Sequence, residues 1–176
     1  MYYSAIGLLA WLVLLIENQD ILLNRNQTFE RPAWKTYRRF LVAVQVYYIT
    51  DIIWGVLENR KLATLLFVDT SVYFVSMAFC VLFWTRYVVD YMESGEKQTG
   101  RFLVGSGRVI ATLVTALTGV NIFTPVLFTV DEQCVYHALA GRYIILSLQI
   151  LLLVLVSIRA FYAMIHTRKT DVYHAR

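Results

Sequence analysis

The chain has 176 residues, of which 59% are hydrophobic and only 16% are charged, and its formal net charge is +4. A soluble globule of this size could not hide so much apolar surface, so the composition excludes an ordinary soluble domain. The basic residues lie in short connections without base-stacking motifs, and we therefore expect no nucleic-acid partner.

Five apolar runs occupy most of the chain, at about 1–23, 40–57, 62–89, 102–123 and 143–165. Each run reaches or approaches the roughly 20 residues that a membrane-spanning helix needs. Backbone polar groups cannot stay unpaired in hydrocarbon, and the alternating segments of a barrel are missing, so the runs predict helices. We expect an all-α fold, a polytopic membrane bundle of five transmembrane helices that forms a single domain over 1–176, with the lipid bilayer as a partner.

The basic residues predict an orientation, because short connections rich in Lys and Arg stay in the cytoplasm. Their number is high in the first connection and in the carboxyl-terminal tail, and low in the second and fourth connections. We therefore expect the amino terminus outside and the carboxyl terminus inside. The residues are Arg25, Arg31, Lys35, Arg38 and Arg39, then Arg60 and Lys61, then Lys97 and Arg101, then Arg142, and finally Arg168, Lys169 and Arg176.

Two acids within the runs, Asp51 and Asp69, carry the strongest functional signal. An ionisable side chain in a membrane costs at least ~2.5 kcal/mol on insertion scales, and an Asp is too short to reach far toward water. The connection between their helices is short, so both acids lie at comparable depth on an antiparallel pair. Each heads a polar and aromatic stripe at helical spacing. The stripes comprise Tyr47, Asp51, Trp54 and Glu58 on the second helix, and Asp69, Tyr73, Ser76 and Cys80 on the third.

Three uses of these stripes remain open. If they face each other, they form an outward-opening pocket for a cationic or polar small molecule whose identity is unknown. Alternatively, each acid bonds Thr50, Thr70, Ser71 or a tyrosine hydroxyl and only fixes the helix packing. A proton relay is the third use.

The basic residues within the runs have simpler explanations. Arg86, Arg108 and Arg159 lie toward the inner face, where a long side chain reaches lipid phosphates, bonds another helix or pairs with Asp90. Arg108 and Thr112 belong to a small, polar face of the fourth helix that is suited to helix packing. We treat Arg86, Arg108, Thr112 and Arg159 as structural or interface residues.

The segment 124–137, on the outer side, is expected to form an apolar lid over the bundle. It contains Cys134 and His137 three residues apart beside two acids, which is a weak match to a metal site. No catalytic motif or nucleotide-binding loop stands out in the chain. We expect no catalytic residues, no metal and no cofactor, and therefore no enzyme activity in these residues.

Several segments resemble a known family. The chain is similar to the amino-terminal membrane sensor region that precedes GGDEF diguanylate cyclase domains in gut Firmicutes, and the resemblance covers nearly the whole chain. The segments that carry it are 17–31, Arg31-Pro32-Ala33-Trp34-Lys35-Thr36-Tyr37-Arg38-Arg39-Phe40, Tyr47-Tyr48-Ile49-Thr50-Asp51-Ile52-Ile53-Trp54-Gly55, Asp69-Thr70-Ser71-Val72-Tyr73-Phe74, 121–128 and 134–138.

This resemblance implies a seven-helix sensor in a bacterial cytoplasmic membrane, whose last helix leads into a cytoplasmic cyclase that makes cyclic di-GMP and forms a homodimer. The chain departs from that plan, because it has five runs and no GGDEF signature. The expectation is therefore a truncated sensor without two helices and the output domain, for which no cyclase residue can be assigned. A small transporter or proton-coupled channel, and a non-catalytic membrane subunit, are the alternatives.

Overall fold

The computed structural model describes residues 2–23, 32–92, 97–131 and 133–174. Within these residues lie five helices, each of which contains a segment long and apolar enough to cross a membrane, as the sequence predicts. Their bounds are α1 Tyr2–Leu22, α2 Pro32–Asn59, α3 Ala63–Tyr91, α4 Lys97–Val120 and α5 Ala140–His174. Arg25, Arg31 and Arg176, which entered the prediction of orientation, lie outside the described residues.

Two helices are longer than their apolar runs. Helix α2 already begins at Pro32, where the fixed φ of proline suits the first turn of a helix. Helix α5 extends over 35 residues, which corresponds to about 52 Å, well beyond the ~30 Å of a hydrocarbon core. Polar residues at the run ends therefore continue these helices instead of ending them.

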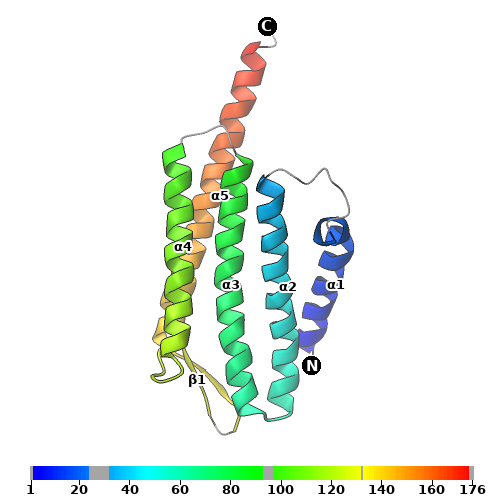
Figure 1. Ribbon diagram of the computed structural model, residues 1–176, viewed down its shortest axis with the longest axis vertical. Coiled ribbons are helices and arrows are strands. Elements are labelled where there is room, and N and C mark those ends of the chain that lie inside the picture. The colour runs from blue at the N-terminus through cyan, green and yellow to red at the C-terminus, as the bar shows by residue number, and fades with distance from the viewer. Residues whose placement is uncertain (1, 24–31, 93–96, 132, 175–176) are drawn as a thin grey trace.

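The helices form an open, curved row (Figure 1). Helix α1 packs on α2, α2 on α3, and α3 on α4, while α5 packs against both α4 and α3. The amino end of α1 and the turn between α2 and α3 lie at one end of the molecule, and the carboxyl end of α5 projects beyond the other helices at the opposite end. Neighbouring helices in the row therefore run antiparallel.

Ring contacts hold α2 and α3 together along most of their length. The centroids are 4.9 Å apart for Tyr37 and Tyr87, 5.2 Å for Phe40 and Trp84, and 4.9 Å for Tyr47 and Tyr73. Because aromatic pairs at such distances add to ordinary apolar packing, they fix the register of the two helices. This register places Asp51 and Asp69 at similar depth, one turn beyond the Tyr47–Tyr73 pair.

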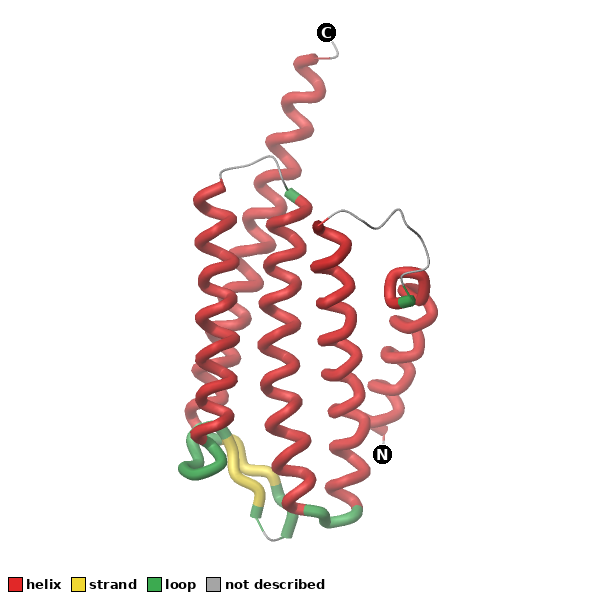
Figure 2. The backbone as a smooth tube through the Cα atoms, viewed as in Figure 1, coloured by secondary structure: helices red, strands yellow, loops and turns green. Residues whose placement is uncertain are grey.

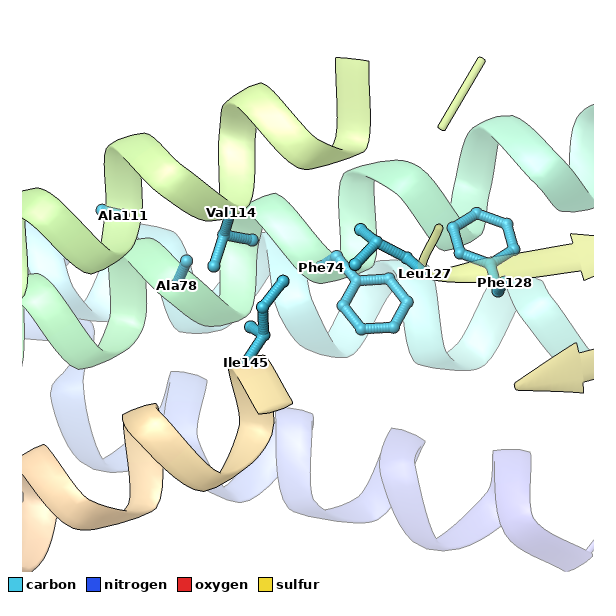
Figure 3. Close-up of a cluster of buried hydrophobic side chains, with 7 residues drawn as sticks. All are labelled: Phe74, Ala78, Ala111, Val114, Leu127, Phe128 and Ile145. Carbon is cyan, nitrogen blue, oxygen red and sulfur yellow. The ribbon is translucent and has the colours of Figure 1, made fainter. Parts of the chain in front are cut away.

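A β-hairpin, which the all-α prediction lacks, closes the end of the bundle between α4 and α5 (Figure 2). Strands β1 (Phe128–Val130) and β2 (Tyr136–Ala138) pair antiparallel, with Thr129 opposite His137. Leu127 and Phe128 are fully buried against Phe74, Val114 and Ile145 from three helices (Figure 3). The predicted apolar lid is therefore confirmed, and its strands are an addition.

Asn121 fastens this hairpin to the end of α4. Its Oδ1 atom accepts hydrogen bonds at 2.7 Å from the backbone N–H groups of Val126 and Leu127, and its Nδ2 group donates to the carbonyl of Phe128 at 3.0 Å. At the start of α5, a methyl group on Gly141 would lie 2.6 Å from the carbonyl oxygen of Val126. The hairpin thus touches α4 and α5 through close backbone contacts.

Candidate functional site

Two tyrosines from the predicted stripes meet between α2 and α3. The hydroxyl oxygens of Tyr47 and Tyr73 are 3.1 Å apart, a hydrogen bond in which either group can donate. Their rings are tilted by 32° and half-buried. The two stripes thus meet at this pair, and one of the two hydroxyls keeps a proton for a further acceptor.

Asp51 lies one turn along α2 from Tyr47 and turns its carboxyl toward α1. A methyl group built on Gly7 would come within 2.9 Å of the Asp51 Oδ2 atom, so the carboxyl occupies space that any larger residue in α1 would fill. Glycine at this position therefore allows an acidic side chain to fit between two helices. Helix α1, which sequence reasoning did not assign to the site, forms one of its walls.

Asp69 stands on the facing helix α3, at a depth similar to that of Asp51. Its Oδ2 atom is buried and has no hydrogen-bond partner among the described residues. A buried carboxyl oxygen without a donor loses its hydration and gains nothing in return, which costs free energy of folding. The Oδ2 atom of Asp69 is therefore an unsatisfied polar atom within the described part of the bundle.

The hydroxyl groups expected to bond these acids serve their own helices instead. Thr70 donates to the carbonyl of Leu66 at 2.7 Å, and Ser71 donates to that of Phe67 at 2.9 Å. Thr50 likewise donates to the carbonyl of Tyr47 at 2.8 Å. Within the described parts of the chain, these hydroxyls do not supply the hydrogen bonds that a purely packing role of Asp51 and Asp69 requires.

Two further polar groups in α1 and α2 are buried without partners. The Nε1 atom of Trp11 and the Nε2 atom of Gln45 find no acceptor among the described residues. Gly7 faces Asp51, so Trp11 lies one turn further along the same interface. Both groups are hydrogen-bond donors. The sequence does contain a signal for Gln45, because a polar Gln is unusual within an apolar run.

The last two members of the predicted site are placed differently. Trp54 is half-buried on α2, one turn beyond Asp51 toward the hairpin end. Ser76 is only 6% exposed, and its hydroxyl donates to the Tyr73 carbonyl at 2.9 Å. Ser76 also borders a groove between α2 and α3, together with Val46 and Val75. Its hydroxyl is therefore committed to its own helix.

The basic residues show three different environments. The Nε atom of Arg86 lies 3.7 Å from the Oδ2 atom of Asp90, which also accepts a hydrogen bond from Thr36 at 2.9 Å. Pairing with Asp90 was one of the alternatives for Arg86. Arg108 and Thr112 are exposed on α4, and Arg159 is half-buried on α5. Their role as interface residues remains a prediction.

The chemistry of the Asp51–Asp69 region suits a positively charged guest. Two carboxyl groups supply negative charge, and the faces of Tyr47 and Tyr73 attract cations through their ring electrons. In a setting of low dielectric, such attractions are much stronger than in water. Among the described residues, no three His, Cys, Asp or Glu side chains come together as metal ligands would.

Comparison of the chain with protein-family models, with curated proteins and with solved structures finds no match.

Proposed function

We propose that this chain is a membrane-embedded sensory domain that binds a small cationic molecule between α1, α2 and α3. One observation carries the proposal: Asp51 and Asp69 each lie one turn beyond the Tyr47–Tyr73 pair, and the buried Asp69 Oδ2 atom has no partner in the described residues. An ammonium group would supply the missing charge and hydrogen bonds, and its binding would stabilise this region.

The orientation belongs to the same proposal, with the amino terminus outside and the carboxyl terminus in the cytoplasm. It is supported by the placement of Lys35, Arg38 and Arg39 at the end of the bundle from which α5 projects, opposite the hairpin. Short segments rich in basic residues are retained in the cytoplasm. Asp51 and Asp69 then lie in the outer half of the bundle, within reach of an extracytoplasmic or membrane-dissolved ligand.

Helix α5 offers a route for the signal. It begins beneath the hairpin, where Gly141 touches Val126, and continues without a break to His174. A rigid helix that crosses the whole bundle can transmit a small displacement from one end to the other. The resemblance to sensors of diguanylate cyclases makes a cyclase of the bacterial cytoplasmic membrane the proposed output.

The test measures the melting temperature of the purified chain in a neutral detergent as tetramethylammonium chloride is added. A ligand that binds only the folded state stabilises it, by ~2.7 kcal/mol at a concentration one hundred times its Kd. We expect a saturable rise in the wild type and none in the double variant Asp51→Asn with Asp69→Asn. Sodium chloride at equal ionic strength is the control for screening.

Glu58→Gln provides a matched variant, because Glu58 is an exposed acid at the end of the same helix. It should keep the response to tetramethylammonium. A rise of the same size with sodium chloride, or one that survives the double variant, would contradict a cation site at Asp51 and Asp69.

A non-catalytic subunit is the second candidate, and one observation favours it. Methyl groups built on Gly105 and Gly119 of α4 would meet nothing within 4 Å, and Arg108 and Thr112 on the same helix are exposed. Small residues on an open face allow another helix to approach closely.

A proton-coupled channel would instead show proton flux in liposomes that the double variant abolishes.

A further inference from the structure

A groove of about 770 Å³ runs between α2 and α3, and neither Asp51 nor Asp69 is among the residues that line it. Four valines, two phenylalanines and Ala43 make up seven of its thirteen lining residues, and Thr118 of α4 lies at its hairpin end. Val42 and Val46 are 51% and 39% exposed, so apolar surface lies open along the groove. An apolar channel of this size needs an apolar occupant.

The few hydroxyl groups in the groove have no proton left to donate to a ligand. Ser71, Ser76 and Thr118 donate their protons to carbonyls of their own helices, at 2.9, 2.9 and 2.8 Å. The walls therefore behave as hydrocarbon along their length, which favours an alkyl chain over a sugar or a peptide.

One end of the groove differs sharply from the rest, because Lys35, Arg38 and Arg39 border it. All three side chains are exposed and form no ion pair with any other residue that the structure describes. Asp90, an acid in the adjacent part of α3, is already held by Thr36 and Arg86. The three basic side chains at the end of the apolar groove can therefore bind an anion.

The length of the groove matches one leaflet of a bilayer. Ser71 and Phe83 both border it, and the α3 segment between them is about 18 Å long at ~1.5 Å per residue. Half of a ~30 Å hydrocarbon core is about 15 Å. A lipid whose phosphate lies at the basic end would therefore place its acyl chain along the whole channel.

We infer that the groove between α2 and α3 is a binding site for an anionic phospholipid. Its phosphate contacts Lys35, Arg38 and Arg39, and one acyl chain packs against Val42, Val46 and the facing side of α3. The inference requires the chain to lie in a membrane, but it is independent of a ligand at Asp51 and Asp69, because neither acid borders the groove.

The test compares lipids added to the purified full chain in a neutral detergent, with the melting temperature as the readout. Dioleoyl phosphatidylglycerol should raise it in a saturable way. Dioleoyl phosphatidylcholine, which has the same chains without net charge, and glycerol phosphate, which has the head group without chains, should have little effect. Equal rises with the two lipids would overturn the site, and so would a full response to glycerol phosphate.

Two matched double variants locate the head group. Arg38→Gln with Arg39→Gln should raise the half-saturating concentration of phosphatidylglycerol roughly 30-fold, as expected when two basic side chains lose their attraction to an anionic lipid. Arg60→Gln with Lys61→Gln removes the same charge at the opposite end of α2 and should leave that concentration unchanged. Equal effects of both variants would show attraction by net charge alone and would refute the site.

Val46→Trp tests the channel itself, because it fills the groove and leaves the three cations in place. It should abolish saturable binding of phosphatidylglycerol, measured on the wild type and the variant by native mass spectrometry as lipid retained per chain. Unchanged retention would refute acyl-chain binding in the groove. A wild-type dimer in lipid-free detergent that Val46→Trp converts to a monomer would assign the groove to a second copy instead.

Discussion

The hairpin end of the molecule and the interface of α1, α2 and α3 differ in whether their buried polar groups are hydrogen-bonded. At the hairpin end, Asn121 is 3% exposed and both ends of its amide are hydrogen-bonded. At the other interface, Trp11, Gln45 and Asp69 each bury a polar atom for which the described residues offer no partner. Thr85 of α3 and Gln149 of α5 also bury one such atom each.

This difference separates a region built for stability from one open to a ligand. A satisfied polar network rigidifies its surroundings, whereas unpaired groups cost free energy that a ligand can recover. The hairpin has its hydrogen bonds and its apolar contacts with three helices in place, so it fixes the end of the bundle. The Asp51–Asp69 region has acceptors and aromatic faces in place and lacks only the positive charge.

The largest expected effect is at Asn121. Asn121→Leu keeps a similar volume but leaves the N–H groups of Val126 and Leu127 and the carbonyl of Phe128 without their partner. We expect the free energy of unfolding in detergent to fall by roughly 3 kcal/mol, since each buried group left unpaired costs ~1–3 kcal/mol. Thermal and chemical unfolding measure it. A loss below that of an exposed control, Thr115→Val, would remove the contrast between the two regions.

Replacement of Asp69 by leucine should change the free energy of unfolding in the opposite direction. Asp69→Leu removes a buried carboxyl oxygen that has no donor among the described residues and also removes its repulsion by Asp51. We expect the free energy of unfolding to rise by about 1 kcal/mol, because isosteric apolar replacement of an unsatisfied polar group is neutral or stabilising. The same unfolding experiments, without organic cations, measure this change.

A loss of stability in Asp69→Leu comparable to that in Asn121→Leu would break the comparison, because it would mean that Asp69 has a structural partner. Asp90→Leu serves as the internal control. Asp90 is an acid on the same helix with two partners, Arg86 and Thr36, so its replacement should destabilise the chain.

The two regions also differ in how far the sequence predicts them. Apolar runs reveal the five helices, because hydrocarbon demands long apolar segments with internal hydrogen bonds. Helical spacing brings Tyr47 to Tyr73, since both lie on stripes of an antiparallel pair. The hairpin is missed because each of its strands has only three residues, too few for an alternating pattern to be read.

Tertiary contacts account for the remaining differences. The fit of Asp51 against Gly7 depends on which face α1 turns toward α2, and nothing in the local sequence specifies that face. The groove next to Ser76 likewise exists only because α2, α3 and α4 meet at particular angles. Lys35, Arg38 and Arg39 were recognised as a signal of orientation, but their position at the mouth of a groove became visible only in the fold.

The smallest expected effect is a dependence of the hairpin on pH. The backbone N–H of Val135 donates to Asp131, and this bond, with further ones from His137 and the N–H of Gln133, holds the pKa of the Asp131 carboxyl below its ordinary value of 3.8. A lowered pKa means that the folded hairpin favours the carboxylate. Its contribution is therefore fully present above pH 3.8 and is lost as the pH falls through the lower folded value.

The NMR signal of the Val135 amide should accordingly shift as the pH falls below 3.8 and the carboxyl is protonated. Asp131→Asn should abolish that shift. The Leu127 amide provides the comparison within one molecule, because it is bonded by Asn121, which does not titrate. A parallel shift of Leu127 would mean that the whole hairpin end opens in acid, and that its stability depends on Asp131 as well as on the Asn121 network.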